Sequence, residues 1–386
     1  MKCLSKILCY TIIFTMVFAL ASIPVHGDEP FDINAKAALL IDQSTGTILY
    51  EKNIHEAFPP ASVTKIMTML LAMEAIDSDK ITLEDKVVVS EYASSMGGTQ
   101  LYLEPGEIKT VEELMKGIAI RSANDASVVI GEHIAGSNDA FVKMMNDKAK
   151  ELGMENTNFL NSNGLDSEGH VTSAYDIALM SMELMKHKDV EKWLTTWMDT
   201  VIVGRQKSEQ QLVNTNRLIR FYDGATGIKT GSTSEAKYCL SASATRGSTS
   251  LIAVIMAAPS SQVRFNEASK LLDYGFANYN TVNAASKDNS VGKVEVQKGK
   301  LLETDAVAKE DLKILVKKGE ESKIKKEVIL PKYIIAPMSK GDKIGEVIVT
   351  LEGKELGRVD LIAPEDVKKA SILNILGRLF KRFVGN

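Results

Sequence analysis

Cysteine is scarce in this chain of 386 residues, which contains only three. Cys3 and Cys9 stand near the N-terminus, so Cys239 is alone in the rest of the chain and a framework of internal disulfides is excluded. A strong charge of one sign is lacking too, because the net charge is −4 and acidic and basic residues are interleaved over most of the length. We therefore expect no nucleic acid as the main partner.

Histidines are few and unpaired. The five histidines are scattered along the chain, and no His-Glu-x-x-His motif occurs. We therefore predict neither a metal site nor a cofactor. With 45% hydrophobic and 25% charged residues, the composition is that of an ordinary globular protein, and the length predicts two domains.

Residues 1–27 have the layout of a secretory signal. Lys2 and Lys6 precede an apolar run from Ile7 to Ala21, and this run of fifteen residues is short for a membrane span, which needs about 20. Small residues stand at the end of this run and after it, at Ala19, Ala21, Ser22 and Gly27, and they allow cleavage either after Ala21 or after Gly27. The alternative is an uncleaved N-terminal anchor. Either way, we expect the protein to work outside the cytoplasm.

The next region, residues 30–280, predicts an α/β domain. Residues 37–50 indicate a hairpin about a Ser-Thr-Gly turn, and several segments with helical periodicity follow between residues 62 and 187. Apolar strands return at residues 238–244 and 251–257, with a further helical segment after them. Strands at both ends that enclose a helical middle favour a single antiparallel sheet.

Two further segments follow this domain. Residues 278–292 turn polar and small, which predicts a domain boundary, and alternating β-branched runs with a turn at Glu352-Gly353 predict a small all-β module over residues 281–362. In residues 363–386 apolar side chains recur every three to four positions between lysines and arginines. Residues 364–386 carry a net charge of +3, against −9 for residues 28–363, which predicts an amphipathic helix on an anionic membrane surface. The alternative is a helix docked on the protein's own core.

Three short motifs carry the candidate chemistry. The first is Ser62-Val63-Thr64-Lys65, which follows a Pro pair that marks a helix start, so that Ser62 and Lys65 lie three apart on one face. A lysine has an ordinary pKa near 10.4, but burial and neighbouring positive charge lower it enough for the amine to accept a proton from Ser62. Because Ser-x-x-Lys also occurs elsewhere in this chain, for example at Ser234, the motif alone is weak.

The other two motifs could complete a cleft. Ser122 and Asn124, in the text Ser-Ala-Asn-Asp, could relay a proton and hold a carbonyl, although such residues also form turns and caps. Lys229-Thr230-Gly231 reads as a strand on which the glycine allows a second backbone to approach closely. There Lys229 and Thr230 could meet a carboxylate, and the strand edge could pair with an extended peptide.

Taken together and in this order, the three motifs form the set found in class A β-lactamases and penicillin-binding proteins. The sequence resembles the low-molecular-mass penicillin-binding proteins, the serine-type D-alanyl-D-alanine carboxypeptidases of peptidase family S11. The resemblance covers most of the chain and implies a transpeptidase-like fold, with an antiparallel sheet and a helical subdomain. A small all-β domain and a C-terminal amphipathic helix then follow. It also implies β-lactam inhibitors and a peptidoglycan stem that ends in D-Ala-D-Ala as ligands.

The resemblance assigns a role to each motif residue. Ser62 would form the acyl-enzyme with Lys65 as general base, while Ser122 and Asn124 would pass a proton to the leaving amine and orient the acyl portion. The strand Lys229-Thr230-Gly231 would bind the terminal carboxylate, and Arg264 would lie near that carboxylate. The backbone N–H groups of Ser62 and Ser232 would stabilise the oxyanion. A surface salt bridge would explain Arg264 equally well.

Departures from the family pattern and rival functions complete the expectations. Ala123 and Lys237 replace residues that are commonly glycine in the family, and Lys237 puts the substrate preference in doubt. Cys239 is expected to be a small buried strand residue.

A class A β-lactamase needs a glutamate three residues before Leu-Asn, but Thr157 stands there. A non-catalytic wall-binding protein is the rival from another class, and endopeptidase action stays open.

Overall fold

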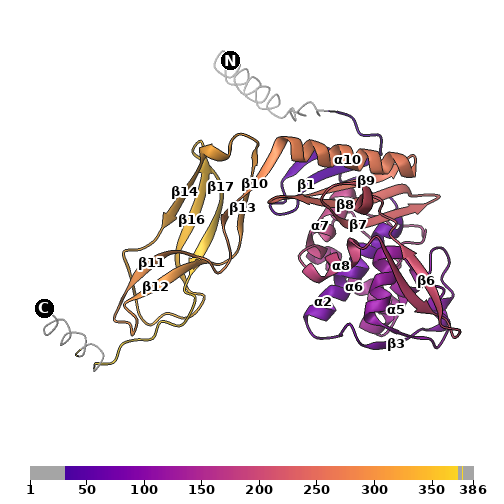
Figure 1. Cartoon of the computed structure of the whole chain (residues 1–386), viewed down its shortest axis with the longest axis horizontal. Helices are drawn as coiled ribbons and strands as arrows, with labels where there is room; N and C mark the ends of the chain where they lie inside the picture. The colour runs from indigo at the N-terminus through magenta and orange to yellow at the C-terminus, as the bar shows by residue number, and fades with distance from the viewer. Residues whose placement is uncertain (1–30, 373–375, 377–386) are drawn as a thin grey trace, which may run out of the picture. The chain divides into compact units, whose positions relative to one another are not determined.

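The computed structural model describes residues 31–372 and residue 376. An antiparallel sheet with the strand order β2-β1-β9-β8-β7 lies at the centre of the first domain (Figure 1). Its strands are β1 (Ala37–Asp42), β2 (Ile48–Lys52), β7 (Ala225–Thr233), β8 (Lys237–Arg246) and β9 (Thr249–Ala258). The predicted hairpin and the predicted union of strands from both ends of the region are confirmed, and β7 is left as an edge strand.

Helices cover the sheet on both faces. α10 (Ser261–Asn278) packs on β8 and β9, while α7 (Ala174–Leu184) contacts β1 and β9 from the other side (Figure 1). The other helical elements are η1 (Ala61–Thr64), α2 (Lys65–Asp77), α3 (Glu91–Ser94), α4 (Val111–Lys116), η2 (Gly117–Arg121), α5 (Asn124–Ala135), α6 (Asn138–Glu151), η3 (Lys188–Val190), α8 (Glu191–Leu194) and α9 (Leu218–Phe221). Two short ribbons pair β3 (Lys86–Val88) with β4 (Ile108–Thr110), and β5 (Met198–Val203) with β6 (Ser208–Val213).

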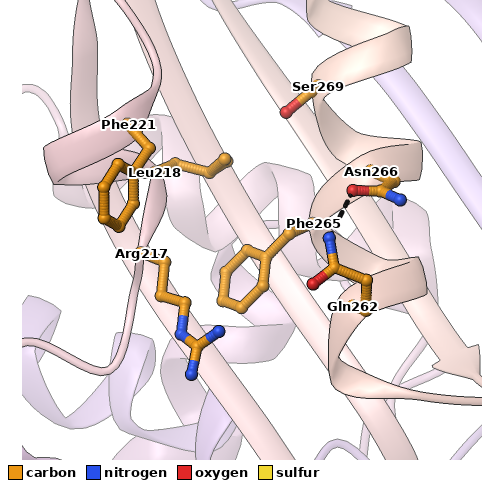
Figure 2. A pocket seen from close by; sticks show the side chains of 7 residues that line it. All are labelled: Arg217, Leu218, Phe221, Gln262, Phe265, Asn266 and Ser269. Carbon is orange, nitrogen blue, oxygen red and sulfur yellow. Dashed lines mark hydrogen bonds between the residues drawn. The ribbon is translucent and has the colours of Figure 1, made fainter.

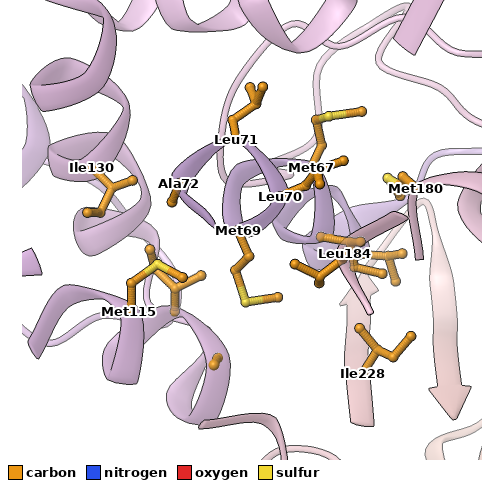
Figure 3. Close-up of a cluster of buried hydrophobic side chains, with 14 of the residues drawn as sticks. Met67, Met69, Leu70, Leu71, Ala72, Met115, Ile130, Met180, Leu184 and Ile228 are labelled. Atoms are coloured by element: carbon orange, nitrogen blue, oxygen red, sulfur yellow. The ribbon is translucent and has the colours of Figure 1, made fainter. Parts of the chain in front are cut away.

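Helix α2 runs through the core of the helical region. Every residue from Lys65 to Met73 is buried, as expected for a helix that is apolar on nearly all sides. Figure 3 shows α2 side chains such as Met69 and Leu70 among side chains of other elements, which are Met115, Ile130, Met180, Leu184 and Ile228. The first residue of this immobilised helix is Lys65, so the core fixes the position of the lysine backbone.

The all-β module has a hydrophobic core of its own. A sheet with the order β14-β16-β17-β12-β11-β15 and a ribbon of β10 and β13 enclose apolar residues such as Val347 and Leu361. The elements are β10 (Tyr279–Ala285), β11 (Ser290–Gln297), β12 (Glu303–Ala308), β13 (Leu312–Lys317), η4 (Glu321–Lys323), β14 (Ile324–Ile329), β15 (Tyr333–Ile335), β16 (Lys343–Leu351) and β17 (Lys354–Ile362). Glu352 and Gly353 join β16 to β17 with positive φ angles, as a tight hairpin turn requires.

The segment after β17 differs from the predicted helix over residues 364–386. Residues 364–371 are not helical. Val367 is buried in the module and forms an isolated β-bridge with Met338, and Lys369 forms another with Gly299. Helical conformation is described only at Ile372 and Leu376, and the rest of the predicted anchor lies outside the described residues. The predicted signal peptide, residues 1–27, lies outside them as well. Among the described helices, none is long and apolar enough to cross a membrane.

Candidate active site

Ser62 and Lys65 meet at the start of the buried helix. Ser62 lies on the 3₁₀ turn η1, Lys65 is the first residue of α2, and Lys65 Nζ is 3.0 Å from Ser62 Oγ. The expectation that the two share a face is confirmed, although the turn is 3₁₀ rather than α-helical. In a 3₁₀ turn, side chains three residues apart eclipse each other, which brings the amine and the hydroxyl together.

The surroundings of Lys65 favour an uncharged amine. Its Nζ lies 2.6 Å from Asn124 Oδ1 and 2.5 Å from the Asn163 carbonyl oxygen. Burial lowers the pKa of Lys65 well below its ordinary value, Lys229 lowers it further, and Asp125 opposes both effects. A neutral amine has two hydrogens and one lone pair. If the two oxygens accept the hydrogens, the lone pair remains for the hydroxyl of Ser62.

Ser122 directly follows the π-helical turn η2, and Asn124 is the first residue of α5. Ser122 is buried and has a left-handed backbone with φ 69°, which is unusual for a residue with a side chain. Its hydroxyl has no hydrogen-bond partner in the described part of the chain, so the structure does not join it directly to Ser62 or Lys65. Asn124 is held at both ends of its amide, since Nδ2 donates to the Gly97 carbonyl 2.7 Å away.

The edge strand β7 passes directly beside the 3₁₀ turn. A side chain on Gly231 would place its Cβ 2.7 Å from the Pro60 carbonyl oxygen and 3.0 Å from the Ser62 nitrogen. Both neighbours are backbone atoms that cannot swing aside, which confirms the predicted need for glycine. The next residue, Ser232, is exposed at this edge. The backbone at Gly231, just before Ser232, therefore lies against the backbone N–H of Ser62.

Lys229 and Thr230 supply cationic and hydroxyl groups to this strand. Lys229 is buried and donates to the Thr230 carbonyl at 3.1 Å, and burial followed by the charge of Arg264 lowers its pKa to about 7. The Thr230 hydroxyl donates to Thr215 Oγ1 at 2.7 Å. A carboxylate placed here would favour the charged form of Lys229, because an opposite charge stabilises the ammonium.

Arg264 holds the strand from α10. Its Nη1 donates to the Gly231 carbonyl at 2.9 Å and to the Cys239 carbonyl at 3.3 Å, and burial lowers its pKa to about 10. The exposed salt bridge considered for Arg264 is thus not what the structure contains. A hollow of about 270 Å³ between α9 and α10 lies near this region (Figure 2). The residues that line it are Arg217, Leu218, Phe221, Gln262, Phe265, Asn266 and Ser269, and none of them is a predicted site residue.

The loop that contains Asn163 and Gly164 was missed as part of the site. Asn163 contributes a backbone carbonyl to Lys65, and a Cβ on Gly164 would be 1.9 Å from the Ala61 carbonyl oxygen, just before Ser62. The Asn161 side chain fixes the turn by accepting from the Gly164 N–H at 2.6 Å. Asn-Gly turn chemistry could have identified the turn but not its distant partner.

His170 supports the same 3₁₀ turn through a chain of hydrogen bonds. Its Nδ1 accepts from the Leu160 N–H at 2.9 Å, so the neutral ring carries its proton on Nε2, which is 2.8 Å from Thr64 Oγ1. Thr64 Oγ1 donates in turn to the Ala61 carbonyl at 2.8 Å. Burial lowers the pKa of His170 to about 4, with Asp166 opposing the effect.

We expect this histidine to make the fold sensitive to acid. Because the folded pKa of about 4 lies below the unfolded value of 6.5, its contribution is complete above pH 6.5 and is lost as pH falls toward 4. The loss amounts to about 3 kcal/mol of unfolding free energy. Urea unfolding of wild type and His170→Gln at pH 7 and pH 4 measures the difference. Equal pH dependence in the two proteins would contradict the expectation.

Lys237 and Cys239, both in β8, have different structural settings. Cys239 is fully buried, as predicted, and burial raises its pKa to about 11, which keeps the thiol protonated at neutral pH. Lys237 is exposed with φ 56°, so glycine would suit this position because of its backbone conformation rather than because of tight packing. Within the described ranges, no group of three or more His, Cys, Asp or Glu residues could hold a metal ion.

The comparisons with known proteins agree with this geometry. The D-alanyl-D-alanine carboxypeptidase family matches residues 24–260, and the C-terminal domain of penicillin-binding protein 5 matches residues 279–369. D-alanyl-D-alanine carboxypeptidase DacF of Bacillus subtilis is 48% identical over 347 residues, which cover 89% of this chain and 88% of the relative.

Two solved structures are similar as well. Penicillin binding protein 5 from Haemophilus influenzae has a TM-score of 0.73 and 32% identity, with 89% of this chain and 100% of that one covered. Penicillin-binding protein D2 from Listeria monocytogenes in its ampicillin-bound form has a TM-score of 0.56 and 31% identity, with 63% and 98% covered. The penicillin-binding-protein fold and the all-β module are thereby confirmed. This chain therefore belongs to the D-alanyl-D-alanine carboxypeptidases of peptidase family S11.

Proposed function

We propose that this chain removes the terminal D-alanine from peptidoglycan pentapeptides through an acyl-enzyme on Ser62. The observation that carries the proposal is the Lys65 amine, 3.0 Å from Ser62 Oγ and poised to accept its proton. Ser62 Oγ bonds to the carbonyl carbon between the two D-alanines, and the C–N bond then breaks. Ser122 passes the proton to the departing amine, and water hydrolyses the ester to free Ser62.

The remaining residues bind the substrate around this reaction. Lys229 and Thr230 receive the terminal carboxylate, Asn124 orients the acyl portion, and the N–H groups of Ser62 and Ser232 stabilise the oxyanion. The charge on Arg264 adds to the positive field, while its hydrogen bonds to two strand carbonyls make it a positioning residue. The ampicillin-bound relative supports β-lactams as inhibitors that acylate the same serine.

The rival functions find less support. Thr157, which stands where a class A β-lactamase has its second base, uses its hydroxyl to bond Asp176 at 2.7 Å. A non-catalytic binding protein would have no need of a buried lysine amine beside a serine hydroxyl. A pentapeptide without its last D-alanine cannot donate a cross-link, so we infer that the enzyme adjusts wall cross-linking and cell shape.

The test is the intact mass of the chain after incubation with penicillin and, separately, with diacetyl-Lys-D-Ala-D-Ala. We expect a stable penicillin adduct on wild type and release of D-alanine, and both should be absent in Ser62→Ala. A short-lived adduct with hydrolysed penicillin and no D-alanine would indicate a β-lactamase instead. No reaction with either compound would indicate a binding protein.

We further propose that residues 1–27 direct export and that the C-terminal residues 364–386 bind the outer face of the cytoplasmic membrane peripherally. A catalytic domain over residues 30–280 and a β-module that begins at about residue 281 are supported by the two matched ranges, 24–260 and 279–369, although the module extends beyond residue 362. Because Val367 belongs to the core of the module, a truncation should end at Ala370. This variant should no longer sediment with anionic vesicles, yet should bind penicillin normally. Unchanged sedimentation would refute the anchor.

A further inference from the structure

A second hollow lies at the end of β7, beyond the residues assigned to the reaction. Its volume is about 450 Å³, and it is lined by Ser232, Thr233, Ser234, Lys237, Tyr238 and Pro259. The hairpin that joins β7 to β8 forms its rim, because Thr233 pairs with Lys237 and Ser232 with Tyr238. The hollow therefore begins at Ser232, whose N–H faces the reacting carbonyl in the proposed mechanism.

Lys237 is the one cationic side chain among the residues that line this hollow. It is exposed, and no acidic group lies within ion-pair distance of its Nζ in the described part of the chain. Glu235, two residues away on the hairpin, is exposed and makes no ion pair with it. Lys237 also keeps a backbone with φ 56°, which a residue with a side chain adopts at some cost. An unpaired cation in a hollow that begins beside the reaction site is available to bind an anionic group of the substrate.

The proposed function fixes the direction in which a substrate crosses β7. The terminal carboxylate lies at Lys229 and Thr230, and the reacting carbonyl lies opposite Ser232, one residue further toward the amino end of the peptide. An extended peptide advances about 3.3 Å per residue. Pairing with the free edge of β7 in this direction carries the residue that precedes the two D-alanines past Ser232. Its side chain then has to reach over the end of β7, because Tyr238 of β8 and Pro259 after β9 line the hollow on the other side of this strand.

We propose that this hollow is a subsite for the side chain of the residue that precedes D-Ala-D-Ala, and that Lys237 favours a side chain ending in a carboxylate over one ending in an amine alone. The inference rests on the proposed carboxypeptidase function, which supplies the direction of the peptide. Tyr238 and Pro259 offer apolar contact for the aliphatic part of such a side chain. The ammonium of Lys237 attracts a carboxylate and repels a second ammonium.

Two matched pentapeptides test this preference. The sequence L-Ala-γ-D-Glu-X-D-Ala-D-Ala is used with X as L-lysine or as meso-diaminopimelate, which differ only by a carboxylate at the end of the side chain. We expect kcat/KM for release of D-alanine to be about fivefold higher with diaminopimelate, the size of a partly exposed ion pair. The difference should lie mainly in KM and should shrink as salt is raised from about 0.05 to 0.5 M.

Three variants separate the cation from its backbone. Lys237→Gly should bring the ratio of the two substrates near one, and Lys237→Glu should reverse the preference. Lys298→Gly is the matched control, because Lys298 is also an exposed lysine with φ 56° but lies in the β-module. It should leave the ratio unchanged.

The outcomes distinguish the two proposals. If wild type releases D-alanine from neither peptide, the proposed function fails. If it hydrolyses both peptides with a ratio that neither Lys237 variant alters, the carboxypeptidase stands and the subsite is refuted.

Discussion

Replacing Lys65 with methionine is expected to slow the acylation of Ser62 by penicillin about 10²–10⁴-fold, the usual contribution of a general base. Methionine fills similar space but cannot accept the proton that Ser62 must lose. The lost amine also leaves Asn124 Oδ1 and the Asn163 carbonyl without their partner, at a cost of about 1–3 kcal/mol in stability each. The time course of adduct formation by intact mass measures the rate.

The control for this variant is Met67→Leu in the same buried helix. Met67 is as deeply buried as Lys65, and exchange of methionine for leucine conserves volume, so stability should change by less than about 1.5 kcal/mol. Its acylation rate should equal that of wild type. If Lys65→Met remains folded by thermal melting and still reacts within tenfold of wild type, Lys65 is not the base.

The pH dependence of the wild-type acylation rate is an independent test of the role of Lys65. Burial and the charge of Lys229 hold the pKa of Lys65 well below its ordinary value, so the neutral amine is present over a wider pH range than for an exposed lysine. As pH falls through the lowered pKa, the amine gains a proton and loses the lone pair that faces Ser62. We therefore expect the acylation rate to fall as pH is lowered. As pH is raised, the rate should reach a plateau well below pH 10.4, the ordinary pKa of lysine.

The motif residues were predictable because their relations are local or generic. Three-residue spacing puts Ser62 and Lys65 together in any helical turn, and a Lys-Thr-Gly strand tolerates close approach of a second backbone. Even so, the sequence could not distinguish a 3₁₀ turn from the start of an α-helix, because helix ends depend on packing. The apolar, β-branched runs of the all-β module were equally local signals.

The features that were missed depend on contacts between distant segments. The hydrogen bond from Lys65 to the Asn163 carbonyl joins residues 98 positions apart, and the bond from His170 to Thr64 joins residues 106 apart. Neither spacing leaves a periodic signal in the sequence. For residues 364–371 the predicted helix was wrong for the opposite reason. The amphipathic pattern is strong there, yet β-bridges at Val367 and Lys369 hold this segment against the module in a non-helical conformation.

Gly164 offers the sharpest test of these distant contacts. It has φ 81°, and a Cβ at this position would lie 1.9 Å from the Ala61 carbonyl oxygen. We expect Gly164→Ala to lower the free energy of unfolding by about 3 kcal/mol, from left-handed strain together with overpacking. The clash falls on the residue before Ser62, so acylation by penicillin should also slow at least about tenfold, because displacement of a nucleophile by 1 Å can cost more than that.

Gly169→Ala separates strain from collision, because Gly169 has a similar φ of 86° but its Cβ would meet nothing closer than Leu160 at 3.9 Å. This variant should lose only about 1 kcal/mol and should acylate at the wild-type rate. Urea unfolding and the rate of adduct formation are measured for both. Equal losses would mean that left-handed strain alone accounts for Gly164. Normal acylation in a destabilised Gly164→Ala would show that the loop supports the fold without positioning Ser62.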